Sequence, residues 1–163
     1  MVADKHRKLI YEVARTLVNQ VSPEEVLLFT AQSEAYFRNP EASLRPQGGK
    51  DVVLGSGEAM VLSLITPAAL DIVSELYRFV VEQAQAVLKT QRARAIEAAV
   101  QAVLLRLTSG TGARPESEPS LSLAGGQVDE LRRMIHNPGS ILKIPEMKLR
   151  TLEDMILAGL LIL

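Results

Sequence analysis

The sequence has no cysteine and no tryptophan, and it has three tyrosines and three phenylalanines among its 163 residues. The absence of cysteine excludes disulfide bonds, thiolate nucleophiles and every metal site that needs a cysteine ligand. Nearly half of the residues are apolar, chiefly Ala, Val, Leu and Ile, and this composition with few aromatic residues favours helices over sheets. The composition is also compatible with a reducing, cytoplasmic location.

Histidine and net charge are scarce as well. His6 and His136 lie far apart, and neither has a second histidine or a carboxylate four residues away, so no metal or cofactor is predicted. The formal net charge of −1 gives no footprint for binding nucleic acid. The sequence has neither a phosphate-binding P-loop nor the serine elbow of a hydrolase. We therefore predict a protein that is not an enzyme.

No apolar run approaches the length of about 20 residues that spans a bilayer. The most apolar stretch, residues 52–76, is interrupted by Glu58, Pro67 and Asp71. Residues 1–8 are polar and charged and do not lead into the apolar core of a signal peptide. A cytoplasmic protein is expected, with membrane binding as a less favoured alternative.

The first part of the chain predicts two helices. Apolar residues recur at the helical period over residues 3–20 and give that helix one apolar face. The next four residues, Ser-Pro-Glu-Glu, match a capping box, in which the Ser22 hydroxyl accepts a backbone N–H and Glu25 reaches back. A second helix is predicted over residues 23–38, and the two helices should form a tight αα-hairpin.

The central part of the chain predicts a long helix. Residues 68–107 contain no Gly or Pro, but the apolar stripe lapses over residues 89–94, which indicates a solvent-crossing stretch or a turn. Thr66-Pro67 predicts a bend before this helix. At residues 52–57 a short strand and a helix that begins near Ser56 are open alternatives, and we favour the helix.

Residues 109–127 are rich in Gly, Pro and Ser, which is typical of a linker. We therefore predict a helical bundle domain at residues 1–108 and a C-terminal docking segment at residues 128–163. That segment should contain a short helix that ends near residues 136–139 and a last helix after Thr151. The predicted fold class is an all-α helical bundle with an αα-hairpin, a long central helix and a linker-connected C-terminal helical segment.

The C-terminal helix is so apolar that a free chain would expose a large patch, so we expect it to dock. It could pack on its own domain, on another protomer or protein, or on a membrane surface. We predict that this helix and the central helix bind a protein partner or form a homo-oligomer. Asp71 is included because it interrupts an apolar run and would need a buried partner if it faced inward. The candidate interaction residues are Leu152, Met155, Ile156, Leu160, Leu163, Val73, Val80 and Asp71.

Four short segments carry a resemblance to a known group of proteins. Residues 33–40 (SEAYFRNP), Lys50-Asp51, residues 54–57 (LGSG) and Thr66-Pro67 resemble small helical modules of bacterial conflict and signalling systems, of the caspase-associated adaptor type. The resemblance covers residues 1–85. It implies a noncatalytic module that couples a sensor or protease-like effector to its partners through helix contacts, and it assigns no binding residue.

Three functional hypotheses follow. The leading one is a noncatalytic helical interaction or adaptor module that assembles through apolar helix faces. The resemblance implies that such a module belongs to a bacterial defence or signalling system. The first alternative is a membrane-active effector that exposes its apolar helices on activation. The second is a small enzyme whose site is shared between subunits, and its first sign would be a perturbed Asp71 or His136 in a shared cleft.

Overall fold

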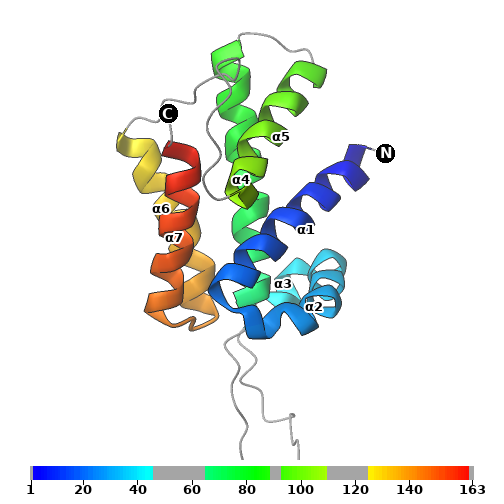
Figure 1. Cartoon of the computed structure of the whole chain (residues 1–163), viewed down its shortest axis with the longest axis vertical. Coiled ribbons are helices and arrows are strands. Elements are labelled where there is room, and N and C mark those ends of the chain that lie inside the picture. Colours follow the sequence, from blue (N-terminus) through cyan, green and yellow to red (C-terminus); the bar gives the residue numbers. More distant parts are fainter. Residues whose placement is uncertain (1, 46–64, 89–92, 110–124, 162–163) are drawn as a thin grey trace, which may run out of the picture.

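The computed structural model describes residues 2–45, 65–88, 93–109 and 125–161, and within these ranges the secondary structure is entirely helical. The all-α prediction is therefore confirmed. The elements are α1 (Val2–Val21), the short 3₁₀ helix η1 (Pro23–Glu25), α2 (Val26–Arg38), α3 (Pro40–Ser43), α4 (Ile65–Leu88), α5 (Ala93–Ser109), α6 (Gly125–Ile141) and α7 (Glu146–Leu161) (Figure 1).

The N-terminal helices lie close to their predicted positions. α1 extends one residue beyond each predicted end, and α2 ends at Arg38 as predicted. α2 ends there because Asn39 leaves the helical conformation and caps α3, with its side-chain oxygen accepting the Ala42 N–H at 3.1 Å. Pro40 follows at the first position of α3, where its missing N–H costs nothing.

The central helix is divided where its apolar stripe lapses. α4 ends at Leu88 and α5 begins at Ala93, so the predicted break at residues 89–94 is confirmed. The two helices contact each other and run in opposite directions, which is the turn rather than the solvent-crossing alternative (Figure 1). The strand-or-helix choice at residues 52–57 lies outside the described residues, as does the approach to Thr66.

The C-terminal helices differ from the prediction in where α6 ends and in where α7 begins. α6 does not end near residues 136–139 but continues through Pro138 to Ile141, and α7 begins at Glu146, well before Thr151. Pro138 removes one helical N–H but is buried, as is Gly139, which packs against Leu149 of α7. A Cβ at Gly139 would lie 2.3 Å from Cδ2 of Leu149, so the glycine is what permits this close contact.

One hydrophobic core joins both ends of the chain. Leu152 and Ile156 of α7 belong to the same buried cluster as Val13 and Leu17 of α1, and α7 contacts α1, α5 and α6. The C-terminal segment therefore packs on its own chain in this structure. Ser109 closes α5 and residues 125–127 open α6, while residues 110–124 of the predicted linker lie outside the described residues. No helix in the described ranges combines the length and apolarity needed to cross a bilayer.

Candidate functional site

The turn between α1 and α2 holds the start of α4. Glu25 is 5% exposed, and its carboxylate accepts the backbone N–H groups of Ile65 at 2.8 Å and Thr66 at 3.0 Å. The Thr66 hydroxyl donates to the same carboxylate at 2.9 Å. The first N–H groups of a helix have no partner within the helix, and they carry partial positive charge. Glu25 therefore caps α4 from 40 residues away in the sequence.

The predicted capping box at this turn is wrong. Ser22 accepts no N–H from the following helix; its hydroxyl donates to Glu24 at 2.6 Å and accepts from the Lys148 ammonium at 2.6 Å. Lys148 also pairs with Glu24 at 2.9 Å, and these hydrogen bonds lower the pKa of Glu24 to about 2. The local pattern misled because the groups that bind Ser22 and Glu25 come from α7 and α4. This turn thus joins the two halves of the chain.

A polar cleft of about 670 Å³ lies between α4 and α6, and Asp71 and His136 both line it. The Tyr36 hydroxyl donates to Asp71 at 3.1 Å, so the inward-facing carboxyl has the partner that its position requires. Burial raises the pKa of Asp71, and burial also raises the pKa of Tyr36 to about 12. The described chain therefore holds a poorly solvated carboxyl in a cleft beside an imidazole.

The imidazole of the cleft is engaged with α7. His136 Nε2 lies 2.7 Å from Glu153, which also accepts from Arg132 Nε at 2.9 Å, and the hydrogen bond to His136 is the main cause that lowers the pKa of Glu153. In the described part of the chain, no hydrogen bond joins His136 to Asp71 or to Ser140, which also lines the cleft. Nor do the described residues bring three potential metal ligands together. The cleft therefore contains the Asp71 carboxyl and the His136 imidazole, but the Ser140 hydroxyl, a potential nucleophile in the lining, is hydrogen-bonded to neither group.

The predicted interaction residues lie mostly inside the molecule. Val73, Val80, Leu152 and Ile156 are fully buried in the core of the same chain, because α4 and α7 turn their apolar faces toward neighbouring helices. No partner can contact these four side chains in this structure. Met155 is half-buried against the same core, and the side chains of Leu160 and Leu163 lie outside the described residues. Asp71 lines the cleft between α4 and α6.

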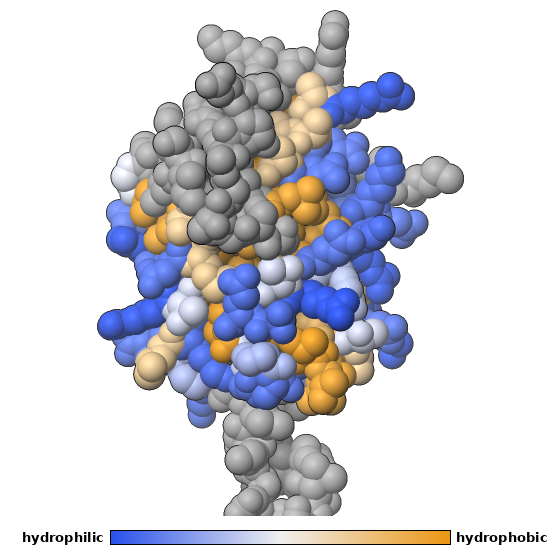
Figure 2. Space-filling model, in the orientation of Figure 1, coloured by the Kyte–Doolittle hydropathy of each residue, from blue (hydrophilic) through white to orange (hydrophobic). Residues whose placement is uncertain are grey.

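The exposed large apolar side chains are others: in the described part of the chain, four of the five lie beside the α1–α2 and α6–α7 turns, and the fifth, Leu105, lies on α5. Leu27 is 93% exposed and Met147 is 83% exposed, and Leu28 and Ile141 are also exposed. The α1–α2 turn and the α6–α7 turn lie at the same end of the bundle (Figure 1), joined by the Lys148–Glu24 ion pair. Figure 2 shows hydrophobic surface at this end, below the polar middle of the view. We call Leu27, Leu28, Ile141 and Met147 the apolar end.

Sequence reasoning missed the apolar end, although one signal for it was present. Residues 26–29 (VLLF) are four successive apolar residues, and a helix that buries one face cannot turn all four inward. In the structure Phe29 is buried and Leu27 faces outward. The sequence around Met147 gives no comparable sign of exposure. Met147 is exposed on α7, and α7 begins at Glu146 rather than after Thr151 as predicted.

No family model, no curated protein and no solved structure matches this chain. The resemblance to bacterial adaptor modules therefore stays a prediction. The function of the chain is therefore inferred from the surfaces of the chain itself.

Proposed function

We propose that this chain is a noncatalytic helical interaction module that binds a second copy of itself through the apolar end. The observation that supports the proposal is the exposure of Leu27 and Met147 on the same end of the bundle. Burying one such side chain contributes about 1.5–3 kcal/mol. Large apolar residues gathered at one end therefore provide a driving force for association that the chain's own core does not use.

A second copy is the occupant that this surface favours. An interface between identical chains related by a two-fold axis needs a surface that complements itself. Four apolar side chains meet that condition, whereas a surface of one charge would repel its copy. The nearby charges of Glu24 and Lys148 already pair with each other and add no net repulsion.

The polar cleft is consistent with a noncatalytic role. Both titratable groups at its centre make contacts between helices: Asp71 with Tyr36 of α2, and His136 with Glu153 of α7. These contacts help to place α2 against α4 and α6 against α7. The adaptor role implied by the resemblance, in which helix contacts couple a sensor or effector to its partners, also belongs to this proposal.

Sedimentation velocity over a range of protein concentrations tests the proposal. The unaltered chain should form a dimer as concentration rises, and the double variant Leu27→Glu with Met147→Glu should stay monomeric because it places charges in the interface. Ala158→Glu is the matched control, since Ala158 is exposed near the other end of the same helix as Met147. It should dimerise like the unaltered chain.

Circular dichroism and thermal melting establish that all three proteins are folded. An unaltered chain that stays monomeric at every concentration would refute the proposal. A double variant that dimerises as well as the unaltered chain would refute it too, because the interface would then lie elsewhere.

A further inference from the structure

The outer face of α1 carries most of that helix's charge. Residues 2–21 contain four Lys or Arg and two Asp or Glu. Lys5, Arg7, Lys8 and Arg15 are all exposed. Lys8 lies 3.9 Å from Glu12 in a solvent-exposed pair, whereas the described residues give Lys5, Arg7 and Arg15 no ion pair. The face therefore presents four cations, of which Lys8 alone has an ion-pair partner among the described residues, although Glu12 and Glu34 lie near it.

Three residues of this face form a regular stripe. Arg7, Tyr11 and Arg15 are four residues apart, and this spacing places them on one side of a helix over about 12 Å at 1.5 Å per residue. We call these three residues the α1 stripe. It has a cation at each end and an aromatic ring between them.

The surface is hollow on both sides of Tyr11. A groove of about 370 Å³ between α1 and α2 is lined by Arg7, Tyr11 and Phe37, among others. A second hollow of about 700 Å³ is lined by Tyr11, Arg15, Val26 and Leu105, among others. Because both hollows share Tyr11 and Lys8, the stripe lies between two concave surfaces with apolar walls.

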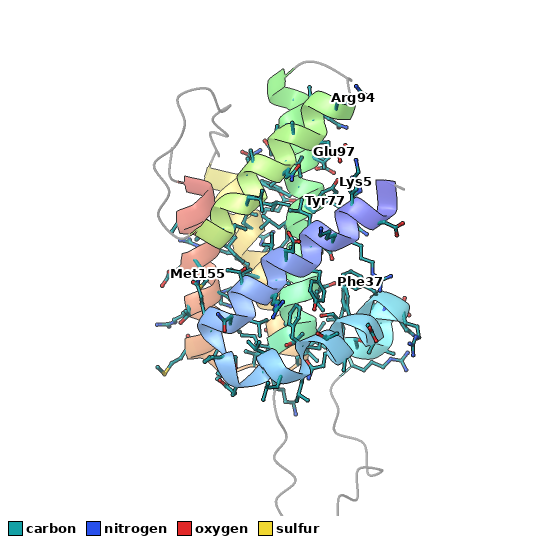
Figure 3. All side chains as sticks on the ribbon, turned by 45° about the vertical axis from the view of Figure 1, so that its right-hand side comes forward. Lys5, Phe37, Tyr77, Arg94, Glu97 and Met155 are labelled. Atoms are coloured by element: carbon teal, nitrogen blue, oxygen red, sulfur yellow. The ribbon has the colours of Figure 1, made fainter. Side chains whose placement is uncertain are left out.

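Contacts within the chain orient the stripe. The Arg7 guanidinium lies over the Phe37 ring at 4.6 Å, and Figure 3 shows Phe37 on α2 beside α1. The Tyr11 ring meets Phe29 edge-on at 5.0 Å, and its hydroxyl lies 3.1 Å from the Thr30 hydroxyl. A stacked guanidinium keeps its N–H donors free at the edge, in a geometry that suits a carboxylate. These contacts restrict the Arg7 and Tyr11 side chains before binding, which lowers the entropy cost of ordering these two side chains.

We infer that the α1 stripe binds an acidic amphipathic helix of a partner protein, with two carboxylates about two turns apart and a large apolar residue between them. The carboxylates pair with Arg7 and Arg15, and the apolar residue enters a hollow beside Tyr11. The inference rests on the proposed function, since it gives the interaction module a second surface besides the apolar end. One chain could then join a copy of itself to a different protein.

The lining residues favour such a helix over other anions. Glu12 and Glu34 lie among the residues that line the two hollows, and they would repel the continuous charge of a nucleic acid backbone. A lipid surface presents no side chain that could fill a hollow beside Tyr11. A helix with separate carboxylates can match both cations and avoid the two acids.

Fluorescence anisotropy with designed peptides tests the inference. The probe is a labelled helical peptide with Glu at positions i and i+7 and Leu at i+3 and i+4. The comparison peptide has the same composition, with the Glu and Leu residues on opposite faces. The unaltered chain should bind the probe at least about tenfold more tightly than the comparison peptide, and added salt should weaken binding.

The double variant Arg7→Glu with Arg15→Glu should lose at least about tenfold in affinity for the probe. Arg133→Glu is the control, because Arg133 is also exposed but lies on α6. It should bind like the unaltered chain. Equal affinity for the two peptides, or an unaffected double variant, would refute the inference.

A polyglutamate peptide, a DNA duplex and vesicles of phosphatidylcholine with phosphatidylglycerol complete the test. Binding to any of them as tight as to the probe would also refute the inference. Repeating the titration with the Leu27→Glu, Met147→Glu variant separates the two proposals. If this variant stays monomeric and still binds the probe, the stripe acts independently of the apolar end. If the unaltered chain dimerises but does not bind the probe, the stripe alone is refuted.

Discussion

The start of α2 and the middle of α7 both carry large apolar side chains, but these side chains have opposite surroundings. Leu27 in α2 is 93% exposed, whereas Leu152 and Ile156 in α7 are fully buried. Both helices pack on neighbours, α2 on α1 and α4, and α7 on α1, α5 and α6, so the difference is the face on which each side chain lies. Leu152 and Ile156 lie on the packed face of α7 and build the core, whereas Leu27 lies on a face of α2 that solvent reaches. Apolar residues left over elsewhere mark the surface available to a partner.

The largest expected effect tests this difference directly. Leu152→Ala removes a fully buried side chain from the shared core and should lower the free energy of unfolding by about 2–5 kcal/mol. Leu27→Ala should change it by less than about 0.5 kcal/mol, because Leu27 faces solvent in the single chain. Urea unfolding monitored by circular dichroism, at concentrations where the chain is monomeric, measures both. Equal losses would contradict the assignment of the two segments.

A second test compares two adjacent acids of the α1–α2 turn. Glu25→Ala leaves the first N–H groups of α4 without their carboxylate and should lower the free energy of unfolding by about 1.5–3 kcal/mol. Glu24→Ala removes an ion pair on the surface and should lower the free energy of unfolding by clearly less than Glu25→Ala does. Urea unfolding again provides the measurement. The account of α4 capping fails if Glu24→Ala proves the more damaging change.

A third test concerns the packing of α6 on α7. Gly139→Ala places a Cβ against Leu149 and should lower the free energy of unfolding by roughly 1–3 kcal/mol. Gly126→Ala is the matched control in the same helix, since no atom lies within 4 Å of its added Cβ. Because Gly126 is the second residue of α6, where alanine is favoured less than in the middle of a helix, Gly126→Ala should raise stability only slightly. Thermal melting of the two variants should therefore show shifts of opposite sign.

The smallest expected effects are two opposite dependences of stability on pH, one from Asp71 and one from Glu153. Because burial raises the pKa of Asp71 in the folded chain, folding is penalised as pH rises through that pKa, and Asp71→Asn should stabilise the protein slightly at neutral pH. The pKa of Glu153 is lowered by His136, so its stabilising contribution is present above the unfolded value and is lost as pH falls. Glu153→Gln should therefore destabilise the protein at neutral pH. Unfolding curves at acidic and neutral pH measure both changes, and shifts of the same sign would contradict this explanation.

Local pattern predicted the helices but not their mutual contacts. Periodicity predicted α1 to within one residue at each end, and the lapse in the apolar stripe predicted the break between α4 and α5. Pro138 was expected to end α6, yet the helix continues to Ile141, with Pro138 buried and Gly139 packed against Leu149 of α7. The effect of that contact on helix length cannot be seen in either segment alone.

The same limit applies to the candidate sites. Asp71 was singled out from its place in an apolar run, but its partner Tyr36 and the nearby His136 come from other helices. Ser22 and Glu25 match a local capping box, yet they bind groups of α7 and α4 that are distant in the sequence. The α1 stripe has regular spacing within one helix, but its hollows require α2 and α5.

The most direct test of the central claim is hydrogen exchange of the unaltered chain, measured by mass spectrometry at low and at high protein concentration. The account predicts that protection rises with concentration in peptides covering residues 26–28 and 141–147, while residues 152–156 are equally protected at both concentrations. Concentration-dependent protection of residues 152–156 without any change at residues 26–28 would contradict the account. The self-association surface would then be the C-terminal helix rather than the apolar end.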